Sequence, residues 1–172
     1  MQDRAYKTGA QVGTGADRDP AAVAAAIARE FRAQPGALLP ILHRVQETLG
    51  WVPPAAIPAI ARELNLSRAE VHGVVTFYHH FRTSPPGRKI VQICRAEACQ
   101  SRGAEALLRH VRERLGCSEA SPTSSDGAHT VEAVYCLGLC ASSPAALIDE
   151  RPHARLDAAR LDALLGSEGV AG

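Results

Sequence analysis

Two closely spaced pairs of cysteines constrain this sequence more than any other feature. Four residues separate Cys94 from Cys99, and three separate Cys136 from Cys140. Thiolates at such spacings on a loop can converge on one iron atom, and two pairs supply the four cysteine ligands of a [2Fe-2S] cluster. The sequence therefore predicts a metal centre in which Cys94 and Cys99 bind one iron and Cys136 and Cys140 bind the other.

Other sites that are built from cysteine fit these spacings less well. Structural zinc sites also use four cysteines, but usually in Cys-x2-Cys knuckles, and neither pair has that spacing, so zinc stays as the alternative metal. A thiol–disulfide exchange site would need Cys-x-x-Cys, which is absent. A Rieske centre needs two histidine ligands, and neither pair encloses a histidine.

Composition and the N-terminal sequence indicate the compartment. Residues 1–20 contain no apolar core behind their charges, and no stretch approaches the roughly 18 apolar residues of a membrane span. In a reducing compartment, paired thiols more often bind metal or do redox work than form structural disulfides. We therefore expect a cytoplasmic protein without a membrane span. Cys117, the fifth cysteine, is expected to be a small buried residue.

Nothing in the sequence predicts catalysis by this chain alone. It has no Gly-x-Gly-x-x-Gly or phosphate-binding loop, so we expect no dinucleotide site. His72, His79 and His80 have no carboxylate partner placed to complete a catalytic or metal constellation. The 19 basic and 18 acidic residues nearly balance, which argues against a broad surface for nucleic acid. We expect no catalytic residues and no binding to nucleic acid.

Apolar periodicity divides the chain into two domains and two tails. Residues 1–18 have no periodicity and predict a flexible tail. Residues 19–82 predict a four-helix bundle, in which Asp19-Pro20 starts the first helix and a capping box at Ser67–Glu70 starts the last. The predicted helices cover about 20–34, 38–49, 53–64 and 68–78.

Residues 83–88 contain Ser-Pro-Pro-Gly and predict a linker. Residues 89–166 predict a small domain that mixes strands and helices, and residues 167–172 a second flexible tail. We expect strands at 90–93, 130–135 and 145–149, and helices at 101–116 and 156–165. The turn signal Ser125-Asp126-Gly127 predicts that the 130–135 strand belongs to a hairpin. The fold class is therefore α+β.

This arrangement places all four paired cysteines at one edge of the sheet. Cys94 and Cys136 each end a predicted strand, and Cys99 lies just before the 101–116 helix. Free N–H groups at the start of that helix can donate hydrogen bonds to cluster sulfurs. Arg95 or Arg102 would raise the reduction potential through its charge.

Three segments resemble one known family. These are Cys-Arg-Ala-Glu-Ala-Cys at 94–99, Cys-Leu-Gly-Leu-Cys at 136–140 with Pro144 after it, and Gly-Val-Val-Thr-Phe-Tyr at 73–78. Together they resemble the thioredoxin-like [2Fe-2S] ferredoxins, over residues 20–166. That family includes the E-type subunit of NADH:quinone oxidoreductase (complex I), related subunits of NAD-coupled hydrogenases, and the gamma subunit of molybdenum-dependent, NAD-dependent formate dehydrogenase. The segments at 94–101 and 69–81 look most like the gamma subunit.

The resemblance implies a helical N-terminal domain and a thioredoxin-like C-terminal domain with one [2Fe-2S] cluster. It also implies association with a beta-type flavin subunit that carries FMN, the NAD site and a [4Fe-4S] cluster. Formate oxidation would take place at a molybdenum cofactor in an alpha-type subunit. The chain itself would transfer electrons and contribute no acid, base or nucleophile.

Two other functions are open on the sequence. Residues 57–81 form two predicted helices joined by the short turn Asn65-Leu66-Ser67, like a helix-turn-helix, so a cluster-containing redox regulator that binds DNA is one alternative. The second helix is too apolar to read base edges and has almost no lysine or arginine for phosphates. A freely diffusing ferredoxin is the other alternative, although a shuttle protein would not need the helical domain.

Overall fold

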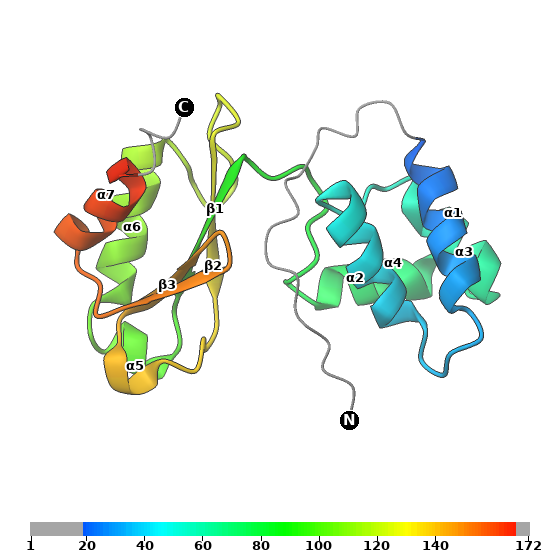
Figure 1. Ribbon diagram of the computed structural model, residues 1–172, viewed down its shortest axis with the longest axis horizontal. Helices are drawn as coiled ribbons and strands as arrows, with labels where there is room; N and C mark the ends of the chain where they lie inside the picture. The colour runs from blue at the N-terminus through cyan, green and yellow to red at the C-terminus, as the bar shows by residue number, and fades with distance from the viewer. Residues whose placement is uncertain (1–18, 168–172) are drawn as a thin grey trace. The chain divides into compact units, whose positions relative to one another are not determined.

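The computed structural model describes residues 19–167. The tail predicted at 1–18 lies outside the described residues, as does most of the tail predicted at 167–172. The chain forms two compact units, one ending at Pro85 and the other beginning at Pro86. Within residues 19–167, the regular structure of the first unit is helical, and the second unit contains a sheet with helices on it (Figure 1).

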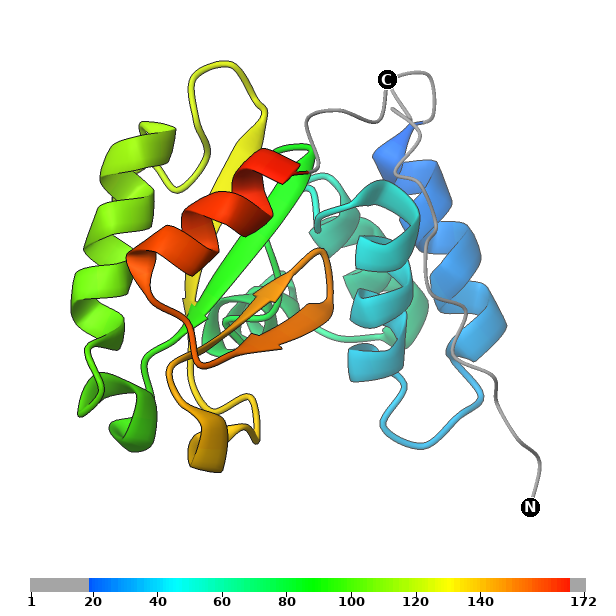
Figure 2. The ribbon, with the colours of Figure 1, turned by 60° about the vertical axis from the view of Figure 1, so that its left-hand side comes forward.

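The four helices described in the N-terminal unit contribute side chains to one hydrophobic core. Their ribbons, from blue to green, are seen in Figure 2. The buried centre of this core includes Ile41, Leu42, Ile60 and Val71. Burial of such side chains is the main favourable term in the folding of a small unit of this kind. The helices are α1 (Pro20–Phe31), α2 (Leu38–Leu49), α3 (Ala56–Leu64) and α4 (Arg68–Phe77).

Local capping sets the ends of these helices, and two predicted caps are confirmed. The Asp19 carboxylate accepts a hydrogen bond from the Ala21 N–H at the start of α1. At α4 the Ser67 hydroxyl accepts from the Glu70 N–H, and the Glu70 carboxylate accepts from the Ser67 N–H, which is a complete capping box. The predicted third helix starts too early, because residues 53–55 form a turn before α3.

A buried glutamine ties α2 to the segment that follows α4. The Gln46 side chain donates to the His80 carbonyl at 2.9 Å, and its amide oxygen accepts from the Arg82 N–H at 2.7 Å. Both backbone groups of this irregular segment are thereby satisfied although Gln46 is only 7% exposed. The last residues of the helical unit are therefore held in place up to the approach to the linker.

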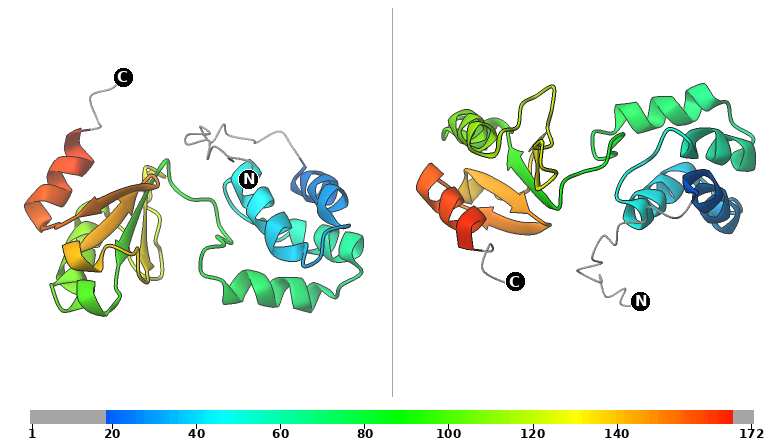
Figure 3. Two further views of the ribbon diagram at one scale, coloured as in Figure 1. Left: turned by 60° about the horizontal axis from the view of Figure 1, so that its bottom comes forward. Right: turned by 90° about the horizontal axis from the view of Figure 1, so that it is seen from above.

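The C-terminal unit is a four-stranded sheet of order β2-β1-β3-β4, with α6 and α7 packed on one face (Figure 3). β1 pairs with β2 in parallel and with β3 antiparallel, and β3 pairs antiparallel with β4. The elements are β1 (Lys89–Cys94), α5 (Glu97–Gln100), α6 (Ala104–Leu115), β2 (His129–Val134), η1 (Cys140–Ser142), β3 (Ala145–Ile148), β4 (Arg151–Ala154) and α7 (Ala158–Ser167).

The helix predicted at 101–116 is wrong at its N-terminal end. Residues 101–103 form a turn, and Gly103 has a left-handed backbone with a φ of 92°, which interrupts the helical path between α5 and α6. Cys99 consequently lies inside the short helix α5, rather than just before a long helix.

The hairpin predicted for the 130–135 strand is limited to one antiparallel bridge, in which Thr130 pairs with Thr123. β2 runs parallel to β1, in a register that pairs Lys89 with His129 and Cys94 with Val134. Parallel strands require a crossover, and α5 and α6 supply it. The turn at 125–127 closes a small loop, which is held by hydrogen bonds from the Ser124 N–H to the His129 carbonyl and from the Val131 N–H to the Pro122 carbonyl.

Strand β4 was not predicted. It forms a hairpin with β3 across Asp149 and Glu150, whose φ angles of 46° and 67° are both left-handed. A two-residue turn of this type usually carries glycine or asparagine, so this sequence gives no hairpin signal. Pro152 fits the strand because β4 is at the edge of the sheet. Among residues 19–167, no helix is long and apolar enough to cross a membrane.

Candidate metal centre

The carboxyl ends of β1 and β2 bring the two cysteine pairs to the same edge of the sheet. Cys94 is the last residue of β1, and Cys136 follows β2 by two residues. Because these strands are parallel and in register, their ends coincide. Cys99 comes from α5, and Cys140 begins η1. The predicted convergence of the cysteine-bearing segments is therefore visible in the fold.

Within each pair the sulfur atoms are close. The Sγ atoms of Cys136 and Cys140 lie 3.8 Å apart, and the thiols of Cys94 and Cys99 share a hydrogen bond. Cys94 and Cys99 pack in a small apolar cluster with Ala104 and Ala145. Neighbouring apolar side chains complete this cluster, namely Ala96, Val134, Leu137 and Leu139.

The two pairs differ in their exposure to solvent. Cys94 and Cys99 are each 2% exposed, whereas Cys136 and Cys140 are exposed. Tyr135, directly before the outer pair, is 69% exposed. The site therefore has an inner pair that is covered by protein and an outer pair that faces solvent.

Backbone N–H groups favour the thiolate form of Cys94. Burial alone would raise the pKa of this thiol, but the N–H groups of Ala96, Leu137 and Cys136 donate hydrogen bonds to it, so its pKa lies below the ordinary value. Burial and the neighbouring Cys94 sulfur raise the pKa of Cys99. A hydrogen bond with the Cys136 thiol raises the pKa of Cys140.

Sequence reasoning missed these donors and misplaced others. The predicted N–H donors at residue 101 do not begin a helix, and the donors that surround Cys94 come from the loops at 96 and 136–137. A backbone N–H carries no sequence signature, so no signal could have identified them. Gly138, in the loop between Cys136 and Cys140, has a left-handed φ of 77°.

The charge on Arg95 is paired. Its Nε donates to a carboxylate oxygen of Glu105 on α6 at 2.6 Å. The sequence indicated Arg95 or Arg102 as a positive charge near the site, and the fold gives Arg95 an anionic partner from the next helix. Glu105 is thus a residue near the site that sequence reasoning missed, because its distance from Arg95 depends on the turn at 101–103.

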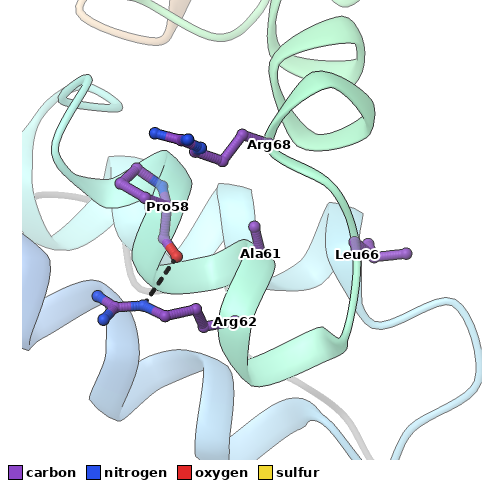
Figure 4. A pocket seen from close by; sticks show the side chains of 5 residues that line it. All are labelled: Pro58, Ala61, Arg62, Leu66 and Arg68. Carbon is purple, nitrogen blue, oxygen red and sulfur yellow. Dashed lines mark hydrogen bonds between the residues drawn. The ribbon is translucent and has the colours of Figure 1, made fainter.

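Away from the paired cysteines, the described part of the chain offers no competing metal site. Cys117 is buried in the core between the sheet and its helices, as predicted. His43 and His80 have ring centroids 5.1 Å apart. Across residues 19–167, no three His, Cys, Asp or Glu side chains gather closely enough to hold a single ion. The pocket in Figure 4 presents two guanidinium groups and no acid, base or nucleophile, and is lined by Pro58, Ala61, Arg62, Leu66 and Arg68.

Comparison with known proteins decides the family. The profile of the thioredoxin-like [2Fe-2S] ferredoxin family matches residues 24–168, which is most of the chain. The chain belongs to this family. The E 2 subunit of the Rhizobium meliloti NADH-quinone oxidoreductase is 39% identical to it over 142 residues, covering 83% of this chain and 84% of that protein. Subunit 2 of the Thermus thermophilus NADH-quinone oxidoreductase is 37% identical to it over 130 residues, covering 75% of this chain and 71% of that protein.

A solved structure gives the same result for the fold. An NAD+-reducing [NiFe]-hydrogenase in its H2-reduced state superposes with a TM-score of 0.64 at 30% identity. The match covers 78% of this chain but only 22% of the hydrogenase chain. The C-terminal unit is thus the thioredoxin-like domain of a [2Fe-2S] ferredoxin of this family.

The residues of this thioredoxin-like ferredoxin fit the cluster that the family carries, which is one [2Fe-2S] centre. Four thiols in two close pairs match a cluster with two irons, each of which takes two cysteine ligands. The N–H groups aimed at Cys94 match the need to stabilise thiolate charge in a covered position.

Proposed function

We propose that this chain is an electron-transfer subunit whose [2Fe-2S] cluster is held by Cys94, Cys99, Cys136 and Cys140. The inner pair would bind one iron and the outer pair the other. The observation that carries this proposal is the meeting of the two pairs at the carboxyl ends of parallel strands β1 and β2. No acid, base or nucleophile of the chain has a part in the reaction.

When bound, a [2Fe-2S] cluster accepts and returns a single electron. The residues of the chain set the conditions for that step. The Ala96, Leu137 and Cys136 N–H groups stabilise negative charge at the Cys94 sulfur, and burial of the inner pair keeps water from one side of the site. The exposed outer pair leaves the other side open to an electron-transfer partner.

The relatives support a place in an NAD-dependent oxidoreductase complex. We propose, from the family resemblance of the sequence, that the chain lies there beside a beta-type flavin subunit that carries FMN, the NAD site and a [4Fe-4S] cluster. Within this class we favour a cytoplasmic, NAD-dependent formate dehydrogenase, because the segments at 94–101 and 69–81 resemble its gamma subunit. Its alpha-type subunit would hold the molybdenum cofactor. NADH:quinone oxidoreductase and NAD-coupled hydrogenase are the second candidates, since they are the complexes named for the relatives above.

The predicted domain organisation belongs to the same proposal. We take residues 19–82 to be a four-helix bundle domain, residues 83–88 the linker and residues 89–166 the cluster domain. The shared core of α1 to α4 and the division of the chain between Pro85 and Pro86 support this assignment.

The first test is to purify the full chain without oxygen and record its low-temperature EPR spectrum after dithionite reduction. Iron and sulfide are assayed on the same sample. We expect a rhombic S = 1/2 signal with iron and sulfide in equal amounts. A chain with stoichiometric zinc and no EPR signal would overturn the proposal in favour of a structural zinc site.

Matched cysteine variants test the ligand set. Cys94→Ala and Cys136→Ala each remove a proposed ligand, and we expect cluster content to fall at least about tenfold. Cys117→Ala is the control, because Cys117 is equally a cysteine of this unit but lies in the hydrophobic core. An unchanged EPR signal in either ligand variant would contradict the assignment of that residue.

The parent complex is tested by affinity purification of the tagged chain from its native host. Copurification of a flavin subunit together with molybdenum, and reduction of NAD+ by formate, would support the formate dehydrogenase. Nickel with hydrogen-dependent activity, or quinone reduction by NADH, would identify one of the other two complexes instead.

A further inference from the structure

The outer cysteine pair has the geometry of a dithiol that is ready to close. The Sγ atoms of Cys136 and Cys140 are 3.8 Å apart, and both residues are exposed. A disulfide needs a separation of about 2.05 Å, so the sulfurs must approach by a little under 2 Å. Rotation about the side-chain bonds of two exposed residues can supply a movement of that size.

The backbone between the two residues leaves room for this movement. Residues 135–139 are neither helix nor strand, so closing the pair breaks no sheet or helix hydrogen bond between them. Gly138 lies at the middle of the segment with a φ of 77°, and among residues 19–167 no atom outside Gly138 and its two chain neighbours lies within 4 Å of the place where a Cβ would be. The loop can therefore adjust without a clash at its centre.

The three other cysteines are protected from reagents in solution. Cys94 and Cys99 are near each other but each is only 2% exposed, and Cys117 is 9% exposed within the core. Thiol–disulfide exchange requires that the attacking cysteine thiolate can reach a sulfur atom of the disulfide. Selectivity for the outer pair follows from this difference in access.

We propose that Cys136 and Cys140 are a site of reversible oxidative modification in the cluster-free chain, closed by small disulfides of the oxidised glutathione class. One cysteine sulfur attacks the disulfide, forms a mixed disulfide and releases one thiol. The second cysteine sulfur displaces the remaining glutathione as a second thiol. The cysteine pair loses two electrons and two protons, and the glutathione disulfide gains them as two thiols.

The disulfide between Cys136 and Cys140 would control whether the chain can take up a cluster. This consequence rests on the proposed function, because a closed pair removes two of the four proposed ligands while the inner pair stays reduced. The oxidised chain would take up no cluster until a thiol reductant reopened the bond. The thiol redox state around the chain would thus gate cluster insertion, independently of the electron-transfer reaction.

The test uses the full-length Cys117→Ala chain after metal removal under reducing conditions. Trypsin then places Cys94 in fragment 90–95, Cys99 in fragment 96–102, and the outer pair alone in fragment 115–155. The chain is treated with oxidised glutathione, alkylated and digested with trypsin. The masses of the fragments are then measured by mass spectrometry. We expect fragment 115–155 to lose both alkylation sites and two hydrogens, while Cys94 and Cys99 remain alkylated.

The control is Cys140→Ser in the same Cys117→Ala chain. Without the second thiol, Cys136 should form a mixed disulfide with glutathione that does not react further. Circular dichroism checks that this variant is folded. A cross-link between fragments 90–95 and 96–102, or stable glutathione adducts on both outer cysteines of the parent, would overturn the inference. Iron and sulfide uptake is measured before and after reduction. If the bond forms but the reduced chain takes up no cluster, the proposed function fails and the modification site stands.

Discussion

At the residue scale, the ion pair with Glu105 balances the positive charge of Arg95, the residue that follows Cys94. Replacement of Glu105 by glutamine leaves Arg95 without its anionic partner. A positive charge near a cluster stabilises the reduced form, which carries one more negative charge, so we expect Glu105→Gln to raise the reduction potential. Glu113→Gln is the control, because Glu113 lies two turns further along α6. Equal potentials in a redox titration of both variants would contradict this role of the ion pair.

Replacement of glycine by alanine is expected to change the free energy of unfolding in opposite directions at two positions. A Cβ on Gly87 would lie 2.6 to 2.9 Å from backbone atoms of His129, and the Gly87 N–H donates to the buried Thr130 hydroxyl. We expect Gly87→Ala to destabilise the C-terminal unit by about 1–3 kcal/mol. Gly73 lies within α4 with open space around it, so Gly73→Ala should stabilise the helical unit by about 0.5–1 kcal/mol. Denaturant unfolding of the two variants measures both signs.

At the scale of single elements, the cap of α4 makes the helical unit sensitive to acid. Hydrogen bonds from the Ser67 N–H and hydroxyl lower the pKa of Glu70 below its ordinary 4.5. A lowered carboxyl pKa contributes stability that is complete above the ordinary value and is lost as the pH falls through the lowered one. Trp51, the single tryptophan, reports unfolding of this unit. Between about pH 6 and about pH 3, we expect the wild-type denaturation midpoint to fall more steeply than that of Glu70→Gln.

Elements defined by neighbouring residues were predictable, and those defined by distant contacts were not. Asp19 and Ser67 made the starts of α1 and α4 predictable, because a helix cap is a hydrogen bond between residues two or three positions apart. The parallel pairing of β2 with β1 depends on a crossover, which no local pattern specifies. The same holds for the site: the spacing of the cysteines predicted the pairs, but not which pair is buried or which N–H groups face Cys94.

On the scale of the whole molecule, two separate cores predict a local effect of cluster removal. The helical core and the core of the sheet unit belong to different compact units. Metal binding contributes folding free energy only where its ligands are. Removing the cluster from the full chain should lower amide protection in β1, α5 and the 135–142 segment and leave α1 to α4 unchanged. Hydrogen exchange followed by mass spectrometry compares the two forms, and a uniform loss of protection would contradict this expectation.

The parallel register of β1 and β2 also has a consequence for the order of events during synthesis. The ribosome delivers the chain from its N-terminus, and domains generally fold as units as they emerge. The helical unit ends at Pro85, whereas Cys140 is made much later and after the whole crossover. A nascent chain can therefore complete its first unit before any of the four proposed ligands has been made, and cluster insertion at the proposed site would have to wait until Cys140 has been added.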